Sequence, residues 1–367
     1  MDRPVRTAVW STGLGVLLVT VVVGSAALGP VRIEPLTVAM AILNAIAVPS
    51  GLELGTRTLP VLGWSVPVPG LEYASVFSFE VPQTHQYIVT QMRLPRIVLA
   101  ATVGFALAAA GTVMQGFFRN PLADPSIIGV SSGAAAGAVA AIAFPALVPF
   151  DSLHLAAFVG ALVTAFFVYA IATEGGHTPV ATLLLAGVAI QAFLGAMISY
   201  MLIHSGDGLR AAIVWLMGSL RDKGWSDVEF ALPVALLGVL VLGAYARELN
   251  VLLLGEEDAR HLGVEVERTK LLLLALASIV TAAGVAVTGV IGFVGLVVPH
   301  IMRLLVGPDH RVLFPTSALA GASFLVVTDT LARWPAGPTE VPVGIVTAAL
   351  GAPFFLFLLT RREVHAV

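Results

Sequence analysis

The chain has 367 residues, of which 58% are hydrophobic and only 11% are charged, and its mean hydropathy is +0.96. Soluble globular proteins are about 25% charged, so this composition excludes a soluble protein and indicates one whose solvent is the lipid bilayer. The net charge of −3 does not indicate a nucleic-acid partner, and the absence of cysteine excludes disulfides, thiol nucleophiles and cysteine-ligated metals.

Apolar segments of membrane length recur along the whole chain. A helix needs about 20 apolar residues to cross the hydrocarbon, and by that measure the sequence predicts an all-α protein with ten membrane spans in one transmembrane domain, 1–367. Their approximate bounds are 8–28, 94–118, 126–148, 155–173, 181–203, 228–246, 271–288, 290–306, 313–331 and 341–359. The first is longer than the ~7–15-residue core of a signal peptide, so we interpret it as an uncleaved helix.

The even number of spans places both termini on one side of the membrane. A small excess of Arg and Lys on that side indicates that it is the cytoplasm of a multi-pass protein in the cell membrane. Residues 29–92 then form an extracytoplasmic loop, in which Leu36 to Ala47 is expected to be a short amphipathic helix. The sequence leaves open whether the Pro- and Gly-rich remainder is a disordered spacer or a small ordered cap.

Three glycines, Gly129, Gly133 and Gly137, recur every four residues in the third span. Residues at this spacing share one helical face, and small residues there let two helix backbones approach each other in lipid. We therefore predict a helix-packing seam along this face.

Residues 249–270, here called the elbow, contain the densest cluster of charge in the chain. The pattern predicts two short helices broken at Gly255 and Gly263. A charge run is usually an ordinary solvated loop. Here, however, leucines and valines alternate with the charges, which suits a surface that presses into a groove on a partner. We predict that the elbow faces the cytoplasm and docks a water-soluble protein.

Several basic and polar residues lie at or inside the predicted spans. Arg93 and Arg96 lie on one helix face at the outer mouth of the second span, and Arg333 ends the ninth. The residues alone leave two interpretations open, namely interfacial snorkelling and a basic rim that meets an acidic external partner. Asp329 lies one turn from Arg333, which favours a structural ion pair.

Several classes of function have no support in the sequence. It contains no G-x-x-x-x-G-K-[ST] phosphate loop, no acid–histidine relay and no arginine-rich span. No histidine has a second one at metal-ligand spacing on its helix. We therefore expect no catalytic residue, no metal site and no cofactor, and we expect ATP hydrolysis to reside in a different chain.

A set of motifs resembles the permease subunits of the ABC importers for cobalamin, ferric siderophores and haem, which have the type II importer fold. The matching segments are MRLPRIVLAATVGFALAAAGTVMQGFFRNPLADPSIIGVSSGAAAG, LLLAGVAI, LLLGEEDARHLGV, GVIGFVGLVVPHIMRLLVGPDHR, LAGASFLVVTDTLAR and EVPVGIVTAALGAPFFLFLL. Together they cover nearly all of residues 91–360. The motifs are most similar to those of the cobalamin permeases.

The resemblance implies a homodimer with a translocation path along its axis, two copies of a separate ATPase subunit and an extracytoplasmic substrate-binding protein. It also implies roles for three groups of residues. The expected ATPase-coupling residues are Leu252, Leu254, Glu256, Glu257, Arg260 and His261. The expected binding-protein contacts are Arg93, Arg96 and Arg333, and the expected cytoplasmic gate consists of Asn120, Leu122, Val180 and Ala181.

The sequence departs from the family in two places. Cobalamin permeases can have small hydroxyl residues where this chain has Val180 and Ala181, which weakens the assignment of a substrate. Residues 48–88 resemble an insertion, to which the family assigns no role. A ferric-siderophore or haem permease therefore remains an alternative, and an ion-coupled secondary transporter is the alternative from another class.

Overall fold

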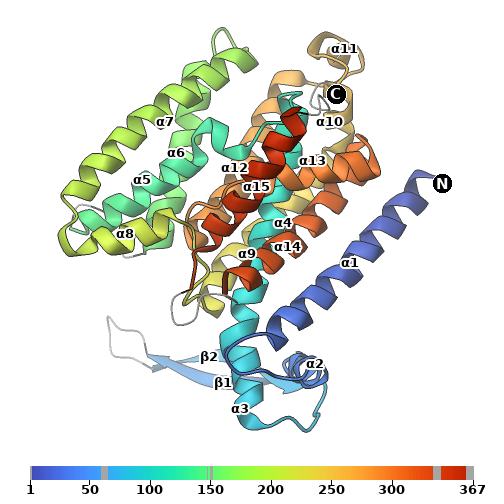
Figure 1. Ribbon diagram of the computed structural model, residues 1–367, viewed down its shortest axis with the longest axis vertical. Helices are drawn as coiled ribbons and strands as arrows, with labels where there is room; N and C mark the ends of the chain where they lie inside the picture. The colour runs from blue at the N-terminus through green and yellow to red at the C-terminus, as the bar shows by residue number, and fades with distance from the viewer. Residues whose placement is uncertain (1, 59–64, 147, 149–151, 334–339, 361–367) are drawn as a thin grey trace.

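In the part of the chain that the structure describes, ten apolar helices form the bundle that the sequence predicts (Figure 1). The structure is a computed structural model that describes residues 2–58, 65–146, 148, 152–333 and 340–360. The bundle helices are α1 (Arg3–Ala27), α4 (Leu94–Phe117), α5 (Val130–Ala143), α6 (Leu153–Ala172), α7 (Val180–Ile203), α9 (Trp225–Ala244), α12 (Val266–Thr288), α13 (Val294–Val306), α14 (His310–Arg333) and α15 (Val343–Thr360).

Seven of these helices are long and apolar enough to cross a membrane, whereas α5, α13 and α15 are shorter apolar helices within the described residues. The all-α, polytopic class is confirmed. The third predicted span differs in detail, because the chain first forms a short 3₁₀ helix, η2 (Pro125–Ile128), and α5 begins only at Val130. Proline at the start of η2 and Gly129 in the left-handed region (φ 85°) separate the two pieces.

The loop between α1 and α4 contains an ordered cap. It comprises α2 (Pro35–Asn44), two strands, β1 (Ala47–Thr58) and β2 (Ser65–Ser75), α3 (Gln83–Tyr87) and the π-helical turn η1 (Ile88–Arg93). The strands are antiparallel, with Ala47 opposite Ser75 and Thr58 opposite Ser65. Of the two possibilities left by the sequence, the structure therefore has the ordered one. The hairpin lies at the opposite end of the molecule from the elbow helices (Figure 1).

Contacts at the start of α1 place it at the elbow end of the bundle. Arg3 forms an ion pair with Asp309 (3.4 Å), and the Asn250 amide donates to the same carboxylate (2.7 Å). Burial alone would raise the pKa of Asp309, but hydrogen bonds from the Arg311 N–H and Asn250, with the charges of Arg3 and Arg311, hold it below its usual value. These contacts therefore join α1, the Asn250 segment and the turn before His310.

Helix α4 lies at the centre of the bundle, where it packs against α9, α12, α13 and α14. Glycines allow the closest crossings. An ideal Cβ placed on Gly104 would lie 2.2 Å from the carbonyl oxygen of Gly321 on α14, and one on Gly111 would lie 1.9 Å from that of Gly295 on α13. No side chain fits at either crossing.

The predicted glycine seam lies between α5 and α6. An ideal Cβ on Gly133 would lie 2.4 Å from the carbonyl oxygen of Gly160, and one on Gly137 would lie 2.3 Å from that of Ala156. The face predicted from the G-x-x-x-G spacing is confirmed as a packing surface.

Candidate coupling and gate sites

The elbow consists of two short helices, α10 (Ala246–Leu252) and α11 (Glu256–His261), followed by the start of α12. The chain turns at Gly255 (φ 126°) and Gly263 (φ 82°), which are the two positions predicted from the sequence. Only glycine adopts such positive φ values readily, so the turn positions follow from local backbone chemistry.

The outer face of the elbow is formed by Leu254, Glu257, Arg260 and His261, which are all exposed. Leu254 has 62% of its surface accessible, although a leucine is normally buried. Leu252 was expected to contact the ATPase. Its side chain is only 6% exposed and packs in the main hydrophobic core instead of lying on the surface. Leu252 therefore supports the elbow from behind.

The inner face of the elbow is held by an ion-pair cluster around Lys270 of α12. Its ammonium lies 2.6 Å from Glu256 of α11 and 3.3 Å from Glu267. Arg260 lies 3.8 Å from both carboxylates. Lys270 is buried with 4% of its side chain exposed, so the pairing supplies the counter-charge that a buried ammonium requires. Glu256 thus serves the elbow's own structure.

The same cluster contacts the loop before α7. The Thr178 N–H donates to Glu267 (3.2 Å), and Lys270 donates to the Thr178 carbonyl (3.4 Å). Thr178 is two residues from Val180, the first residue of α7. The sequence indicated neither contact, because these residues are far apart along the chain.

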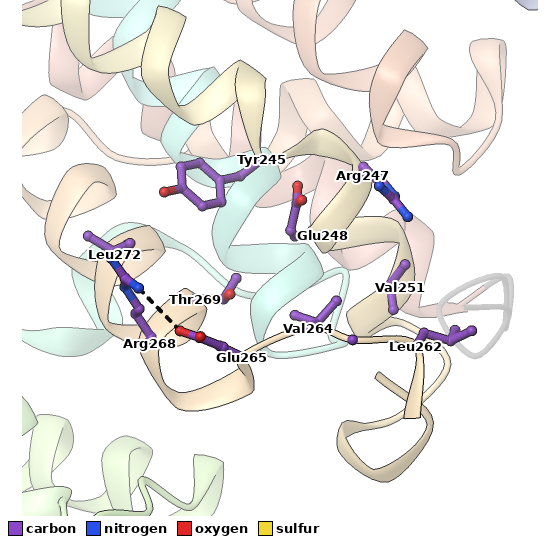
Figure 2. A pocket seen from close by; sticks show the side chains of 11 residues that line it. Tyr245, Arg247, Glu248, Val251, Leu262, Val264, Glu265, Arg268, Thr269 and Leu272 are labelled. Carbon is purple, nitrogen blue, oxygen red and sulfur yellow. Dashed lines mark hydrogen bonds and ion pairs between the residues drawn. The ribbon is translucent and has the colours of Figure 1, made fainter. Parts of the chain in front are cut away.

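A cleft of about 370 Å³ lies between α10 and the start of α12, and Figure 2 shows the side chains that line it. Its walls are polar and apolar side chains from both helices and from the intervening turn. They are Tyr245, Arg247, Glu248, Val251, Leu262, Gly263, Val264, Glu265, Arg268, Thr269 and Leu272. Arg268 and Glu265 pair across one side (3.3 Å), and one oxygen of Glu248 is buried without a hydrogen-bond partner in the described chain. The cleft could accept a side chain from a partner.

The predicted gate residue Asn120 shapes the turn after α4. Its side-chain oxygen accepts a hydrogen bond from the Leu122 N–H (2.9 Å), and the preceding Arg119 has a positive φ of 48°. Asn120 is exposed and Leu122 is half-buried. The turn is therefore locally fixed and still accessible at the elbow end.

The second pair of predicted gate residues begins α7, where Val180 is half-buried and Ala181 is exposed. Helix α7 is joined to the segment after the Asn120 turn through Gln191, whose amide donates to the carbonyls of Ile127 (2.7 Å) and Ser126 (3.2 Å). The sequence does not reveal these partners, because they lie more than 60 residues from Gln191 along the chain.

The three outer arginines form part of an internal network at the other end of the bundle. Arg93 is 7% exposed and donates to the carbonyls of Ala26 and Val31 at the end of α1. Arg96 pairs with Asp329 (2.9 Å) and Glu340 (2.8 Å). Arg333 shares Asp329 at 3.2 Å and, as the sequence predicts, forms an i,i+4 pair. These side chains link α1, α4 and α14, and little of their surface is free.

Comparison with known proteins places this architecture in one family. Residues 16–361 match the FecCD transport family. The chain belongs to the FecCD transport family. It is 59% identical over 370 residues to the cobalamin import system permease protein BtuC of Halobacterium salinarum, with all of both chains covered. The resemblance identified from the motifs is therefore confirmed.

Other relatives are named for different substrates. The hemin transport permease HmuU of Yersinia pestis is 43% identical, with 85% of this chain and 92% of the relative covered. The Fe(3+) dicitrate permease FecD of Escherichia coli is 41% identical, with 81% and 92% covered. These relatives are transport permease subunits, so the comparisons do not indicate an enzyme.

The fold also resembles that of a solved ABC transporter. A structure described as the inward-facing conformation of a metal-chelate type ABC transporter is 31% identical and has a TM-score of 0.75, with 96% of this chain and 98% of that chain covered.

The Halobacterium relative aligns with the whole chain, so it also has a counterpart of residues 48–88.

Proposed function

We propose that this FecCD permease imports cobalamin across the cytoplasmic membrane, powered by a separate ATPase subunit. The observation that supports cobalamin most strongly is the 59% identity, over the full length, to a protein named as a cobalamin import permease. The working unit is a homodimer with two ATPase copies and an extracytoplasmic binding protein. Both termini lie in the cytoplasm, on the same side as the elbow.

The elbow's outer face is the proposed ATPase docking surface. Leu254, Glu257, Arg260 and His261 offer apolar contact and charge of both signs on one exposed helix and turn. The neighbouring cleft gives an ATPase side chain a place to insert. Glu256 supports this surface from the inner face, because its ion pairs fix the orientation of α11.

The ion-pair cluster provides a route from the elbow to the gate. A displacement of α11 moves Glu256, which is paired with Lys270, and Lys270 is bonded to the carbonyl of Thr178. Thr178 precedes the proposed gate residues Val180 and Ala181. Gln191 then connects α7 with the segment that follows Asn120 and Leu122. We propose that ATP-driven movement of the elbow opens both gate segments by this route.

We propose that the binding protein contacts Arg93, Arg96 and Arg333. In this role an acidic residue of the partner would have to compete with Asp329 and Glu340 for Arg96. The binding protein would therefore have to replace these internal ion pairs when it docks.

The deciding experiment is transport by the permease reconstituted in proteoliposomes with its ATPase and binding protein. We expect labelled cobalamin to accumulate only when ATP and an active ATPase are present, and a protonophore to have no effect. Uptake of haem or ferric dicitrate instead of cobalamin would favour the alternative that the 43% and 41% identical relatives suggest. Uphill uptake by the permease alone in an ion gradient would indicate a secondary transporter.

A further inference from the structure

A small cavity lies inside the bundle where two helices are interrupted. It has a volume of about 70 Å³, and its polar lining side chains are Asp124, Ser126, Ser131 and Thr281. The rest of its wall is mainly apolar and comes from Leu107, Pro125, residues 290–292 and Gly295. On one side the chain leaves α4 and forms η2 before α5 begins. On the other side α12 ends at Thr288 and α13 starts at Val294. Non-helical backbone at this depth in a membrane protein is tolerated where it lines a polar cavity.

The carboxylate of Asp124 lies beside the middle of α4, away from both ends of the bundle. An ideal Cβ on Gly295 would lie 3.2 Å from Oδ2 of Asp124 and 2.9 Å from the carbonyl oxygen of Leu107. Oδ1 accepts a hydrogen bond from the Ser126 N–H (2.9 Å). No basic nitrogen of the described residues lies within 4.0 Å of the Asp124 carboxylate. An unpaired carboxylate in such a place costs several kcal/mol.

Thr281 supplies a second, independent indication that the cavity holds a ligand. On the same helix, the hydroxyls of Ser278 and Thr288 donate to carbonyls four residues earlier, at 2.7 and 3.0 Å. Thr281 is 1% exposed, lines the cavity, and its hydroxyl has no hydrogen-bond partner within the described chain. A buried hydroxyl without a partner costs about 1–3 kcal/mol, which a ligand in the cavity would offset.

The interrupted backbone adds further oxygen atoms. Ile291 and Gly292 lie between α12 and α13, and no backbone N–H of the described residues donates to their carbonyls. The carbonyl of Val290 faces Gly218 and Gly344 and is not counted among these oxygens. Carboxylate, hydroxyl and carbonyl oxygens are hard ligands that suit alkali and alkaline-earth cations. Calcium sites use more oxygens and commonly several carboxylates, whereas this cavity has one carboxylate, which balances a single positive charge.

We propose that this cavity binds one alkali metal cation between Asp124, Thr281 and the backbone of Ile291 and Gly292. A cation in this place neutralises the carboxylate, gives the Thr281 hydroxyl a partner and joins the two interruptions. About one water can share the space, because a water occupies roughly 30 Å³ in the liquid. The bound cation would fix the segment that follows Asn120 and Leu122. The inference does not depend on which substrate is imported.

The test is thermal unfolding of the purified full-length permease in nanodiscs, in NaCl, KCl or choline chloride at equal ionic strength. A ligand that binds only the folded state raises the midpoint. We expect NaCl or KCl to raise it by about 2–4 °C over choline chloride, in a saturable manner, and the comparison of the two salts identifies the preferred cation. Equal midpoints in all three salts would overturn the proposal.

Three variants localise the effect. Asp124→Asn should abolish the response to the cation, and Thr281→Val should shift it to a several-fold higher concentration. Thr288→Val is the matched control, because its hydroxyl already bonds to Gly284, and it should respond as the wild type does. An unchanged response in Asp124→Asn would overturn the site. If Asp124→Asn does not fold, binding of ²²Na⁺ or ⁸⁶Rb⁺ to the wild type and to Thr281→Val decides, and no displaceable binding overturns the proposal.

Discussion

The ammonium nitrogen of Lys270 lies 2.6 Å from a carboxylate oxygen of Glu256, which joins the first turn of α12 to α11. The sequence shows only that both residues belong to a charged segment. In the structure only 4% of the Lys270 side chain is exposed, compared with 33% of the Glu256 side chain. The pair therefore belongs to the interior of the elbow, and the neighbouring Glu257 belongs to its surface.

Replacing Lys270 by Met should loosen the elbow. Breaking a buried pair costs about 3–5 kcal/mol, and the partial exposure of Glu256 reduces this to roughly 1–3 kcal/mol. Hydrogen exchange should accelerate across residues 249–265 and in the loop before α7, which loses its bond from Lys270 to Thr178. Arg268→Met is the control, because both partners of its pair are more than 70% exposed, and it should have little effect. Unchanged exchange in Lys270→Met would contradict the role of the cluster.

Docking of the ATPase should depend on the exposed face of the elbow. Glu257→Lys and Leu254→Asp alter residues that are accessible and form no part of the Lys270 cluster. We expect each to reduce co-purification of the ATPase at least several-fold, without changing the unfolding midpoint of the permease. Asp222→Lys, an exposed charge at the opposite end of the bundle, should have no effect. Full recovery of the ATPase with both elbow variants would exclude this face as the docking surface.

The outer arginines can be tested by removing the acid that they share. Asp329→Asn deprives Arg96 and Arg333 of a buried carboxylate that is 1% exposed, and should cost about 3 kcal/mol or more in stability. The same change removes the acid that both guanidinium groups share, while Arg96 keeps its pair with Glu340. If they contact the binding protein, Asp329→Asn should retain or strengthen its capture, more clearly at low salt. Arg96→Gln should weaken both stability and capture.

A different outcome separates the two roles. If Arg96→Gln lowers the unfolding midpoint and leaves capture of the binding protein unchanged, the arginines serve only to join α1, α4 and α14. Pull-down affinity and thermal unfolding, measured on the same preparations, provide the comparison.

The sequence predicted the ten apolar helices and the elbow turns because each depends on local properties. A run of apolar residues predicts a span by itself, and Gly255 and Gly263 mark turns because few residues tolerate positive φ. The glycine seam on α5 was also predictable, since its spacing defines a helical face. Family membership followed from motifs that occur in a fixed order along residues 91–360.

Features that depend on long-range contacts could not be predicted. Leu252 and Leu254 are both leucines in one charged segment, yet one is 6% exposed and the other 62%. Their difference arises from how α10 packs on the bundle. The partners of Arg96, Lys270 and Gln191 are likewise distant in sequence. The hairpin was missed because the prolines and glycines of residues 48–70 suggested a loop without regular structure.

Packing at the glycine seam gives a prediction with a simple steric basis. Gly133→Ala would place a Cβ 2.4 Å from the carbonyl oxygen of Gly160, so α5 and α6 would have to separate. Overpacking of this kind costs about 1–3 kcal/mol. Gly15→Ala on α1, where nothing lies within 4 Å, should leave the unfolding midpoint unchanged or slightly raised. A midpoint for Gly133→Ala equal to that of Gly15→Ala would contradict the close approach.

Gln191 should control leakage through the gate. Gln191→Leu leaves the carbonyl of Ile127 without its donor, at a cost of about 1–3 kcal/mol, whereas the carbonyl of Ser126 keeps its bond from the Gly129 N–H. The segment after Asn120 and Leu122 then loses its connection to α7. We expect proteoliposomes to release trapped substrate faster in the absence of ATP, while the ATPase still co-purifies. Ser199→Ala, which removes only a bond within α7 to Gly195, is the matched control. Equal leakage from the two variants would show that the connection does not hold the gate closed.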